Sequence, residues 1–299
     1  MRVLAIAITY NPDVALLAEV LHSIAPQARG VVIVDNGSAN AAAILEIAST
    51  IRAHVIANTQ NRGIAAAQNQ GIDFAEKNDF SHVLLLDQDT VLSPKVVADL
   101  SAHLKSLELD CGNVAAIGPA YFEVHSRQRT RAYRSAGLLL SRIPLATATQ
   151  PVESDFIIAS GSLIPIPVFK KIGPFNEDLF IDLVDVDWCF RARAAGYRCF
   201  ISPTAVVEHR LGAGTVKIGQ RRVAIHVPIR NYYWVRNALW LARQPYTPLA
   251  WRLYFRSRVM AFLATYPTVG DRRGLRLRLI YQGIKDGIGG NLGPINEIT

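Results

Sequence analysis

Four short and almost uninterrupted apolar segments in the first 90 residues constrain the fold of this chain more than any other feature. They are Val3–Thr9, Val31–Val34, His54–Ala57 and His82–Leu86. A strand with one face in water alternates apolar and polar residues, whereas a continuously apolar strand is covered on both faces. The pattern therefore predicts an open, mostly parallel α/β sheet with helices on both sides.

The segments between these strands have helical character, which completes the strand–helix alternation. Helices are expected at Val14–Ile24, Ala41–Ser49, Ile64–Glu76 and Pro94–Leu107. Ligands of such sheets bind beyond the carboxyl ends of the strands. Four polar loops, at 9–12, 35–38, 58–63 and 87–90, should therefore line one crevice.

The acidic triplet Asp87-Gln88-Asp89 directly follows the fourth apolar segment. Residues two apart in an extended chain point to the same side, so the two carboxylates can converge just beyond the sheet. Two hard oxygen donors suit Mg²⁺ or Mn²⁺ completed by phosphate and water. Such triplets also occur by chance as solvated turns, so the metal interpretation depends on this position at the ligand edge.

Two further polar motifs end neighbouring strands. Asp35-Asn36-Gly37-Ser38 can accept hydrogen bonds from a base or ribose, and Gly37 permits a close approach of the backbone. Asn61-Arg62-Gly63, with Asn69 on the following helix, offers donors for ribose or phosphate. An ordinary turn at Asp35 and a helix N-cap at Asn61 are the simpler alternatives.

Together with Thr9-Tyr10-Asn11-Pro12, these motifs strongly resemble the family 2 glycosyltransferases with the GT-A fold, and bacterial rhamnosyltransferases in particular. Their order and spacing match over roughly the first 210 residues, and a set of ordered motifs is more specific than any one of them. The resemblance implies a Rossmann-like, mostly parallel sheet flanked by helices.

The resemblance also implies roles for individual residues. The nucleotide base and ribose would be held by Thr9, Tyr10, Asn11 and Asp35. The ribose and phosphates would lie near Asn61, Arg62, Asn69 and Asp87. The metal would be held by Asp87 and Asp89, with Asp89 as the more direct ligand, and His209 would complete the site. A lone histidine is more often structural, so His209 depends on the family position.

The segment Phe180–Arg191 resembles the part of the family that supplies the catalytic base, and Asp185 takes that position. Val184 stands where the family usually has Glu. Asp182 and Asp185 are expected to be neighbours, whereas Asp187 should point elsewhere, to the helix N-terminus or to Arg191.

From Pro228 onward the pattern is helical, with breaks at Pro245, Pro248 and Pro267. We expect a catalytic domain over 1–225 and a helical region over 226–299. The net charge of +8 suits an anionic partner, and the region is rich in arginine among Tyr, Trp and Leu. A basic amphipathic helix on a membrane and a contact between subunits of a homo-oligomer both fit this pattern. Arg230 and Arg236 could bind a diphosphate or pair with acids.

Other functional classes fit the sequence poorly. No helix-turn-helix, RNA-recognition or zinc signature supports nucleic-acid binding. A nicotinamide-dependent oxidoreductase needs a Gly-x-Gly-x-x-Gly turn where this chain has Thr9-Tyr10-Asn11-Pro12. Three cysteines without metal-ligand spacing fit a reducing compartment, and no apolar run is long enough for a membrane span. The sequence thus favours a cytoplasmic protein, in solution or peripheral on the inner face of the membrane.

The sequence therefore predicts an inverting, metal-dependent glycosyltransferase in which Asp185 is the base. We expect the donor to be dTDP-rhamnose, and the alternative is a UDP-sugar-dependent glycosyltransferase of the same fold. The expected acceptor is a hydroxyl of a cell-surface polysaccharide or a lipid-linked glycan.

Overall fold

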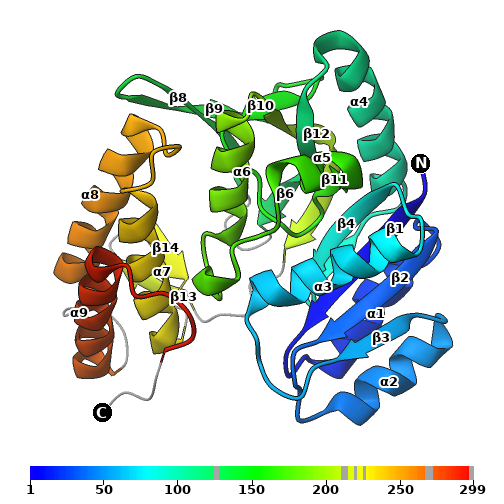
Figure 1. The fold of residues 1–299 in the computed structure, drawn as a ribbon, viewed down its shortest axis with the longest axis horizontal. Helices are drawn as coiled ribbons and strands as arrows, with labels where there is room; N and C mark the ends of the chain where they lie inside the picture. Colours follow the sequence, from blue (N-terminus) through cyan, green and yellow to red (C-terminus); the bar gives the residue numbers. More distant parts are fainter. Residues whose placement is uncertain (124–127, 210–214, 219–220, 225–226, 267–271, 296–299) are drawn as a thin grey trace.

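The computed structural model describes the backbone of the chain apart from residues 124–127, 210–214, 219–220, 225–226, 267–271 and 296–299. For 122–123, 128–129, 208–209, 215–218 and 221–224 it describes the backbone alone. Figure 1 shows a central sheet between helices, with the last three helices packed at one side.

Within the described residues, ten strands form one sheet, whose main path runs in the order β10-β12-β6-β11-β4-β1-β2-β3, with β5 paired to β12 and β7 to β6. These strands are β1 (Val3–Thr9), β2 (Gly30–Asp35), β3 (His54–Ala57), β4 (His82–Asp87), β5 (Thr90–Leu92), β6 (Val114–Glu123), β7 (Gln128–Arg129), β10 (Val152–Ser154), β11 (Leu163–Pro165) and β12 (Arg198–His209). Strands β3, β2, β1 and β4 are parallel, while β11 runs antiparallel between β4 and β6. Two hairpins lie apart from this sheet, β8 (Arg131–Ala136) with β9 (Leu139–Pro144) and β13 (Thr215–Ile218) with β14 (Arg221–Ala224).

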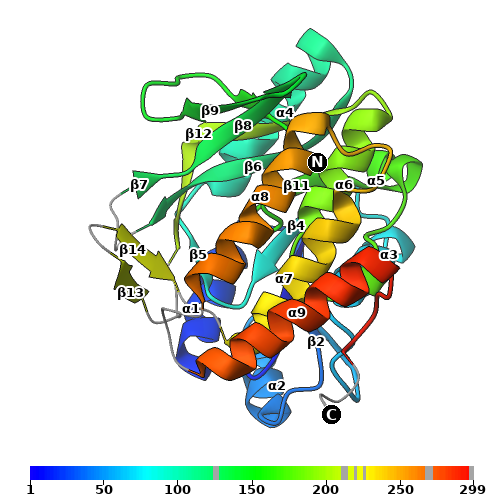
Figure 2. The same ribbon diagram turned by 90° about the vertical axis from the view of Figure 1, so that its left-hand side faces the viewer.

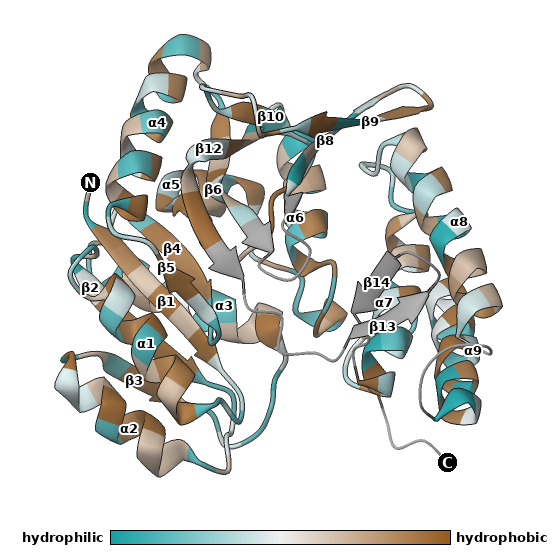
Figure 3. Ribbon diagram, turned by 180° about the vertical axis from the view of Figure 1, so that it is seen from behind, coloured by the Kyte–Doolittle hydropathy of each residue, from teal (hydrophilic) through white to brown (hydrophobic). Residues whose placement is uncertain are grey.

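The helices cover both faces of the sheet. They are α1 (Val14–Ile24), α2 (Ala41–Thr50), α3 (Ile64–Lys77), α4 (Val96–Cys111), α5 (Ile166–Ile172), α6 (Val184–Ala194), α7 (Pro228–Leu241), α8 (Leu249–Thr265) and α9 (Arg273–Gly289), with a 3-10 turn at Glu177–Leu179. Alternate residues of β1 enter different cores: Leu4, Ile6 and Ile8 pack with α3, α5 and α6, whereas Val3, Ala5 and Ala7 pack with α1, α2 and α4. This two-sided burial explains the continuous apolar segments, and β1 and β4 are coloured largely hydrophobic in Figure 3.

The predicted fold class is confirmed, and the first four strands agree with their predicted positions to within one residue at each end. The mixed pattern of residues 114–210 also predicts strands at 135–140 and 155–158, and both of these predictions are wrong. A strand predicted over residues 135–140 is instead the turn between β8 and β9, because Gly137 has a φ of +57°. A strand predicted over residues 155–158 is absent, since β10 ends at Ser154. The Asp155 carboxylate there accepts hydrogen bonds from Ser135 N (2.7 Å) and Trp251 Nε1 (2.7 Å).

The C-terminal helices pack directly against the rest of the protein. Val186 and Phe190 of α6 belong to the same apolar cluster as Trp251 and Phe255 of α8 and Val235 of α7. Figure 2 shows α8 and α9 on the outer side of α7. No helix among the described residues is both long and apolar enough to cross a bilayer.

Candidate active site at the carboxyl edge of the sheet

The ends of β1 and β2 meet at the edge of the sheet, where Thr9 pairs with Asp35. Thr9 Oγ1 donates to Asp35 Oδ1 (2.9 Å), and Ser38 donates to Asp35 through its N–H (3.0 Å) and its hydroxyl (2.5 Å). Asp35 is buried. These donors hold the carboxylate in one orientation beside the crevice.

The loop after β1 is tied to the loop after β2 and to the acidic triplet. Asn11, at a φ of +46°, donates its N–H to Ser38 Oγ (2.8 Å) and accepts from Ala39 N (2.8 Å). Tyr10 donates its N–H to Gln88 Oε1 (2.8 Å). The Tyr10 side chain is 47% exposed, so its ring is accessible at this edge.

Asn36 organises the loop between β3 and α3. Its amide donates to Asn61 Oδ1 (3.1 Å) and to the Gly63 carbonyl (3.0 Å), and its oxygen accepts from Arg62 N (3.1 Å). Asn61 also accepts from Gly63 N (2.9 Å). The Arg62 side chain is exposed, so Arg62 is the member of this motif that can reach an anionic ligand.

Asn69 has different partners from those expected of a nucleotide contact. Its amide donates to the Phe175 carbonyl (3.0 Å) and to Glu177 Oε1 (2.9 Å), and its oxygen accepts from Phe175 N (3.0 Å). Asn69 is buried. Both of its amide protons are thus used to join α3 to the segment before α6.

The acidic triplet lies half-buried at the end of β4. Asp87 donates its N–H to Ser160 Oγ (2.8 Å), which in turn donates to Thr90 Oγ1 (3.0 Å). The pKa of Asp87 is raised to about 7, chiefly by burial and then by the nearby carboxylates of Asp89 and Asp185, while Arg230 acts in the opposite direction. The structure thus brings Asp185, about 100 residues later in the chain, beside the triplet.

Asp185 lies in the first turn of α6 and is only partly buried. Its carboxylate accepts hydrogen bonds from Ala159 N (3.1 Å) and Val186 N (2.9 Å). Its pKa is raised to about 6, chiefly by burial and to a lesser extent by Asp182, although the two N–H donors act in the opposite direction. The electrostatic contact confirms that Asp182 and Asp185 are neighbours.

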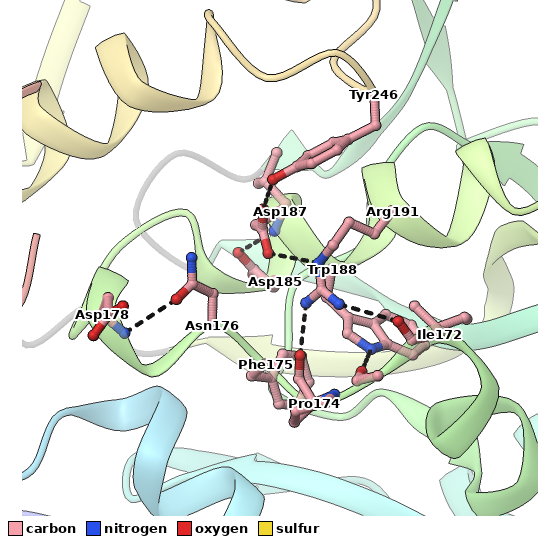
Figure 4. Close-up of polar contacts among 12 residues, drawn as sticks. Ile172, Pro174, Phe175, Asn176, Asp178, Asp185, Asp187, Trp188, Arg191 and Tyr246 are labelled. Atoms are coloured by element: carbon pink, nitrogen blue, oxygen red, sulfur yellow. Dashed lines mark hydrogen bonds and ion pairs between the residues drawn. The ribbon is translucent and has the colours of Figure 1, made fainter. Parts of the chain in front are cut away.

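Asp187 points away from this cluster, as predicted. Its carboxylate is buried and accepts from Arg191 Nε (2.9 Å) and from the Tyr246 hydroxyl (2.6 Å). Trp188, the next residue of α6, is also buried and donates to the Gly173 carbonyl (3.0 Å). Figure 4 shows the contacts of Asp187 with Arg191 and Tyr246, beside Asp185.

The expected metal ligands come together only in part among the described residues. Asp87 and Asp89 are adjacent, but no group of three His, Cys, Asp or Glu side chains among the described residues could hold a metal ion. The side chain of His209 lies outside the described part. Its backbone pairs with Thr90, the residue after Asp89, so the strand register brings His209 near the triplet.

Two residues of the site, Ser160 and Gln88, were not predicted in this role from the sequence, and the role of a third, Arg230, was predicted only as one of two alternatives. Ser160 and Gln88 hold the backbone of the acidic triplet and of Tyr10, respectively. Arg230 of α7 forms a two-point ion pair with Asp182, Nε to Oδ2 at 2.7 Å and Nη2 to Oδ1 at 2.5 Å. The sequence left Arg230 open between a diphosphate and an acid, and the structure pairs it with an acid beside the site.

Comparisons with known proteins agree on the fold. The model of "Glycosyl transferase family 2" matches residues 5–173. The dTDP-rhamnosyl transferase RfbF of Shigella flexneri is 31% identical over 252 residues, which is 83% of this chain and 82% of that protein. S. aureus TarS 1-349 in complex with UDP-GlcNAc is similar in structure, with a TM-score of 0.59 and 15% identity over 96% of this chain and 82% of that one.

A second structural relative is GalNAc-T7 with UDP, GalNAc and Mn²⁺, with a TM-score of 0.58 and 14% identity over 86% of this chain. This chain spans 54% of the length of that one. At such identities the structural likeness shows the fold alone. The family match and the Shigella relative carry the assignment.

Proposed function

Since the chain belongs to glycosyl transferase family 2, we propose that it transfers rhamnose from dTDP-rhamnose to a hydroxyl of a glycan, with inversion at the anomeric carbon. The meeting of the acidic triplet and Asp185 at one edge of the sheet, where Asp87 N binds Ser160 Oγ and Asp185 accepts from the neighbouring Ala159 N, is the observation that carries this proposal. The 31% identity to a dTDP-rhamnosyl transferase supports the choice of sugar and nucleotide.

Asp185 acts as the base in this proposal. The two backbone N–H donors fix its direction, and its partial exposure leaves it accessible to an acceptor. A general base works best when its pKa lies near the operating pH. With a pKa of about 6, Asp185 is ionised near neutral pH and is still more basic than an ordinary aspartate.

Asp87 and Asp89 fit a divalent cation. The raised pKa of Asp87 reflects its burial and, after that, the neighbouring negative charges, and a bound cation would relieve the repulsion between these charges. Mg²⁺ needs only one or two carboxylates when phosphates and water supply the other oxygens, so the absence of a third ligand among the described side chains is compatible with it. Such a cation supplies charge stabilisation for a leaving diphosphate. His209 is the candidate for an additional ligand.

The donor nucleotide would lie across the ends of β1 and β2. Asp35, held by Thr9 and Ser38, would accept a hydrogen bond from the base or ribose. Tyr10 would stack its exposed ring on the base, and Asn11 would shape that loop. Asn61 and Arg62 would face the ribose and phosphates, whereas Asn69 is left out because its amide is used within the protein.

The donor assignment is tested by measuring transfer and hydrolysis with a panel of nucleotide sugars in the presence of Mn²⁺. We expect dTDP-rhamnose to react at least tenfold faster than UDP-sugars, with Asp185→Asn as the control of lowest expected activity. A preference for a UDP-sugar would replace the donor and keep the reaction class. No turnover with any nucleotide sugar would overturn the proposal.

We further propose that the outer side of α8 and α9 contacts an anionic membrane, where a lipid-linked acceptor would be found. Residues 227–299 hold 11 of the 32 Lys and Arg residues and 3 of the 24 acidic residues, so they carry the whole net charge of +8. Exposed apolar side chains accompany these cations, with Met260 65% and Tyr281 69% exposed. Cations beside exposed apolar groups suit a lipid surface.

Membrane contact is tested by co-sedimentation with vesicles of anionic and of neutral lipid. Arg256→Glu with Arg258→Glu should weaken binding to anionic vesicles about tenfold or more, at roughly 1 kcal/mol per surface cation. Lys77→Glu with Lys105→Glu changes the charge equally on α3 and α4 and should bind like the wild type. Dimers in solution without vesicle binding would favour the oligomer interpretation instead.

A further inference from the structure

The segment just before α6 has an unusually strained backbone. We call residues 178–183 the acceptor-side loop. Within it Phe180, Asp182 and Leu183 have φ angles of +62°, +70° and +62°. Phe180 also has a ψ of −63°, and Ile181 N donates to the Leu179 carbonyl (2.7 Å), which is a strained γ-turn. Non-glycine residues hold such angles only where the surroundings impose them.

Two side chains of α7 impose this conformation by binding the loop carbonyls. Arg236 Nη2 donates to the carbonyls of Asp178 (3.1 Å) and Leu179 (2.9 Å). The Asn237 amide donates to the carbonyls of Leu179 (3.0 Å), Ile181 (2.9 Å) and Asp182 (2.8 Å). Arg236 Nε donates to Asn237 Oδ1 (2.9 Å), so the two side chains form one unit.

The remaining loop carbonyl is held from the opposite side. The carbonyl of Phe180 accepts from Ile64 N (2.7 Å) at the start of α3. Gly63, at a φ of +86°, allows this approach because a Cβ there would lie 2.6 Å from that carbonyl oxygen. All five successive carbonyls from 178 to 182 therefore have a donor from outside the loop.

Arg236 and Asn237 are themselves held rigidly. Both are fully buried, with 0% exposure. The Arg236 guanidinium lies 5.4 Å from the ring centre of Tyr232 and 5.0 Å from that of Tyr233, and it also donates to the Gly293 carbonyl. A buried guanidinium with these contacts has no path to a diphosphate, so its role is within the protein.

We infer that Arg236 and Asn237 are positioning residues for Asp185. The inference rests on the proposed function. The loop ends at Leu183, two residues before Asp185, so its conformation determines where α6 begins and where the Asp185 carboxylate points. Arg230, on the same helix as Arg236 and Asn237, also holds the loop, through its ion pair with Asp182. The C-terminal helix α7 is therefore part of the active centre, although its side chains at 236 and 237 touch no substrate.

The test compares Asn237→Ala with Asn231→Ala. Asn231 is also buried on α7, but its oxygen accepts from Arg276 Nη1 (2.7 Å) and not from the loop. We expect Asn237→Ala to lower kcat for transfer about 100-fold, because a displacement near 1 Å has such an effect, and to change KM for the donor less than threefold. Asn231→Ala should lose similar thermal stability and keep kcat within threefold.

Arg236→Lys sharpens the test, because lysine keeps the charge but cannot reach several carbonyls with a planar fork. It should lower kcat at least tenfold. Equal losses of kcat in Asn237→Ala and Asn231→Ala, or normal kcat in Asn237→Ala, would overturn the inference.

Hydrogen exchange separates this inference from the proposed function. The amides of residues 180–187 should exchange at least tenfold faster in Asn237→Ala than in Asn231→Ala, with or without any activity. Unchanged exchange would refute the positioning role of Arg236 and Asn237 even in an active enzyme. Faster exchange in a protein that transfers no sugar would support that positioning role and refute the proposed function.

Discussion

The two sides of the candidate site are built in different ways. The proposed donor side consists of loops at the ends of β1, β2 and β3, and its hydrogen bonds join neighbouring loops, as between Thr9 and Asp35. The acceptor-side loop has three non-glycine residues at positive φ and depends on α7, more than 50 residues later in the chain. A parallel sheet positions the first side by itself, whereas the second needs a separate support.

This difference suggests that one side of the site determines nucleotide affinity and the other determines turnover. The loops that follow the sheet can bind a nucleotide with geometry already fixed by strand pairing. The carboxylate that would take the acceptor proton must be placed more exactly, and its loop is held in a conformation that the backbone alone would avoid. Changes on the acceptor side should therefore affect turnover, and changes on the donor side should affect affinity.

Asp185→Asn should give the largest effect and the clearest separation of the two sides. We expect a loss of turnover of about 1000-fold, because the amide cannot accept the acceptor proton. Affinity for the nucleoside diphosphate, measured by calorimetry with Mn²⁺, should change less than threefold. Near-normal turnover would show that another group is the base.

Asp89→Asn should affect both sides, since the cation would bridge the protein and the diphosphate. We expect kcat/KM to fall about 100-fold, in keeping with the loss of several kcal/mol of charge stabilisation. The nucleotide should also lose its Mn²⁺-dependent protection against thermal unfolding. Full protection by Mn²⁺ and nucleotide in this variant would contradict the metal assignment.

The pH dependence tests the acceptor side without a mutation. A base must be deprotonated to act, and the pKa of Asp185 is about 6. Activity should therefore rise through pH 6, and kcat/KM at pH 5 should be about one-tenth of its value at pH 8. A profile that is flat between pH 5 and pH 8 would exclude Asp185 as the titrating base.

Thr9→Val should weaken the donor side alone. It removes the hydroxyl that donates to buried Asp35, so the carboxylate loses one of its fixing contacts. We expect the dissociation constant for the nucleotide to rise about fivefold, the effect of roughly 1 kcal/mol, while kcat stays within twofold. A loss of kcat without loss of affinity would contradict the assignment of affinity to the donor side and of turnover to the acceptor side.

Asp87→Asn should give the smallest effect when stability is measured in EDTA. The folded-state pKa of about 7 lies above the unfolded value, so the folded protein holds the extra proton and its stability falls as pH rises from about 4 to 7. Asparagine removes this loss and should raise the free energy of unfolding by about 1 kcal/mol at pH 8, and by nothing measurable at pH 4. Urea denaturation at both pH values measures the free energy of unfolding of the variant and of the wild type. Destabilisation of the variant at pH 8 would contradict the raised pKa of Asp87.

Sequence patterns were sufficient for the sheet and for part of the site. The apolar segments located the first four strands, and residue spacing placed Thr9, Asp35 and Asp87 at one edge. Patterns gave no sign of contacts with distant residues. The Asn69 amide, for example, binds Phe175 and Glu177, which are 106 and 108 residues away. Asp155 was predicted to lie in a strand, and no pattern nearby in the chain indicates its contact with Trp251.

The sequence by itself determined the layered α/β fold, the positions of strands β1 to β4 along the chain and the residues that end them, because strand burial and helix periodicity are encoded within short segments. Tertiary structure decided the direction of each carboxylate, the raised pKa values of Asp87 and Asp185, and the partners of Arg230, Arg236 and Asn237. These properties depend on burial and on charges or donors brought from distant parts of the chain, and no local pattern records which of them will meet.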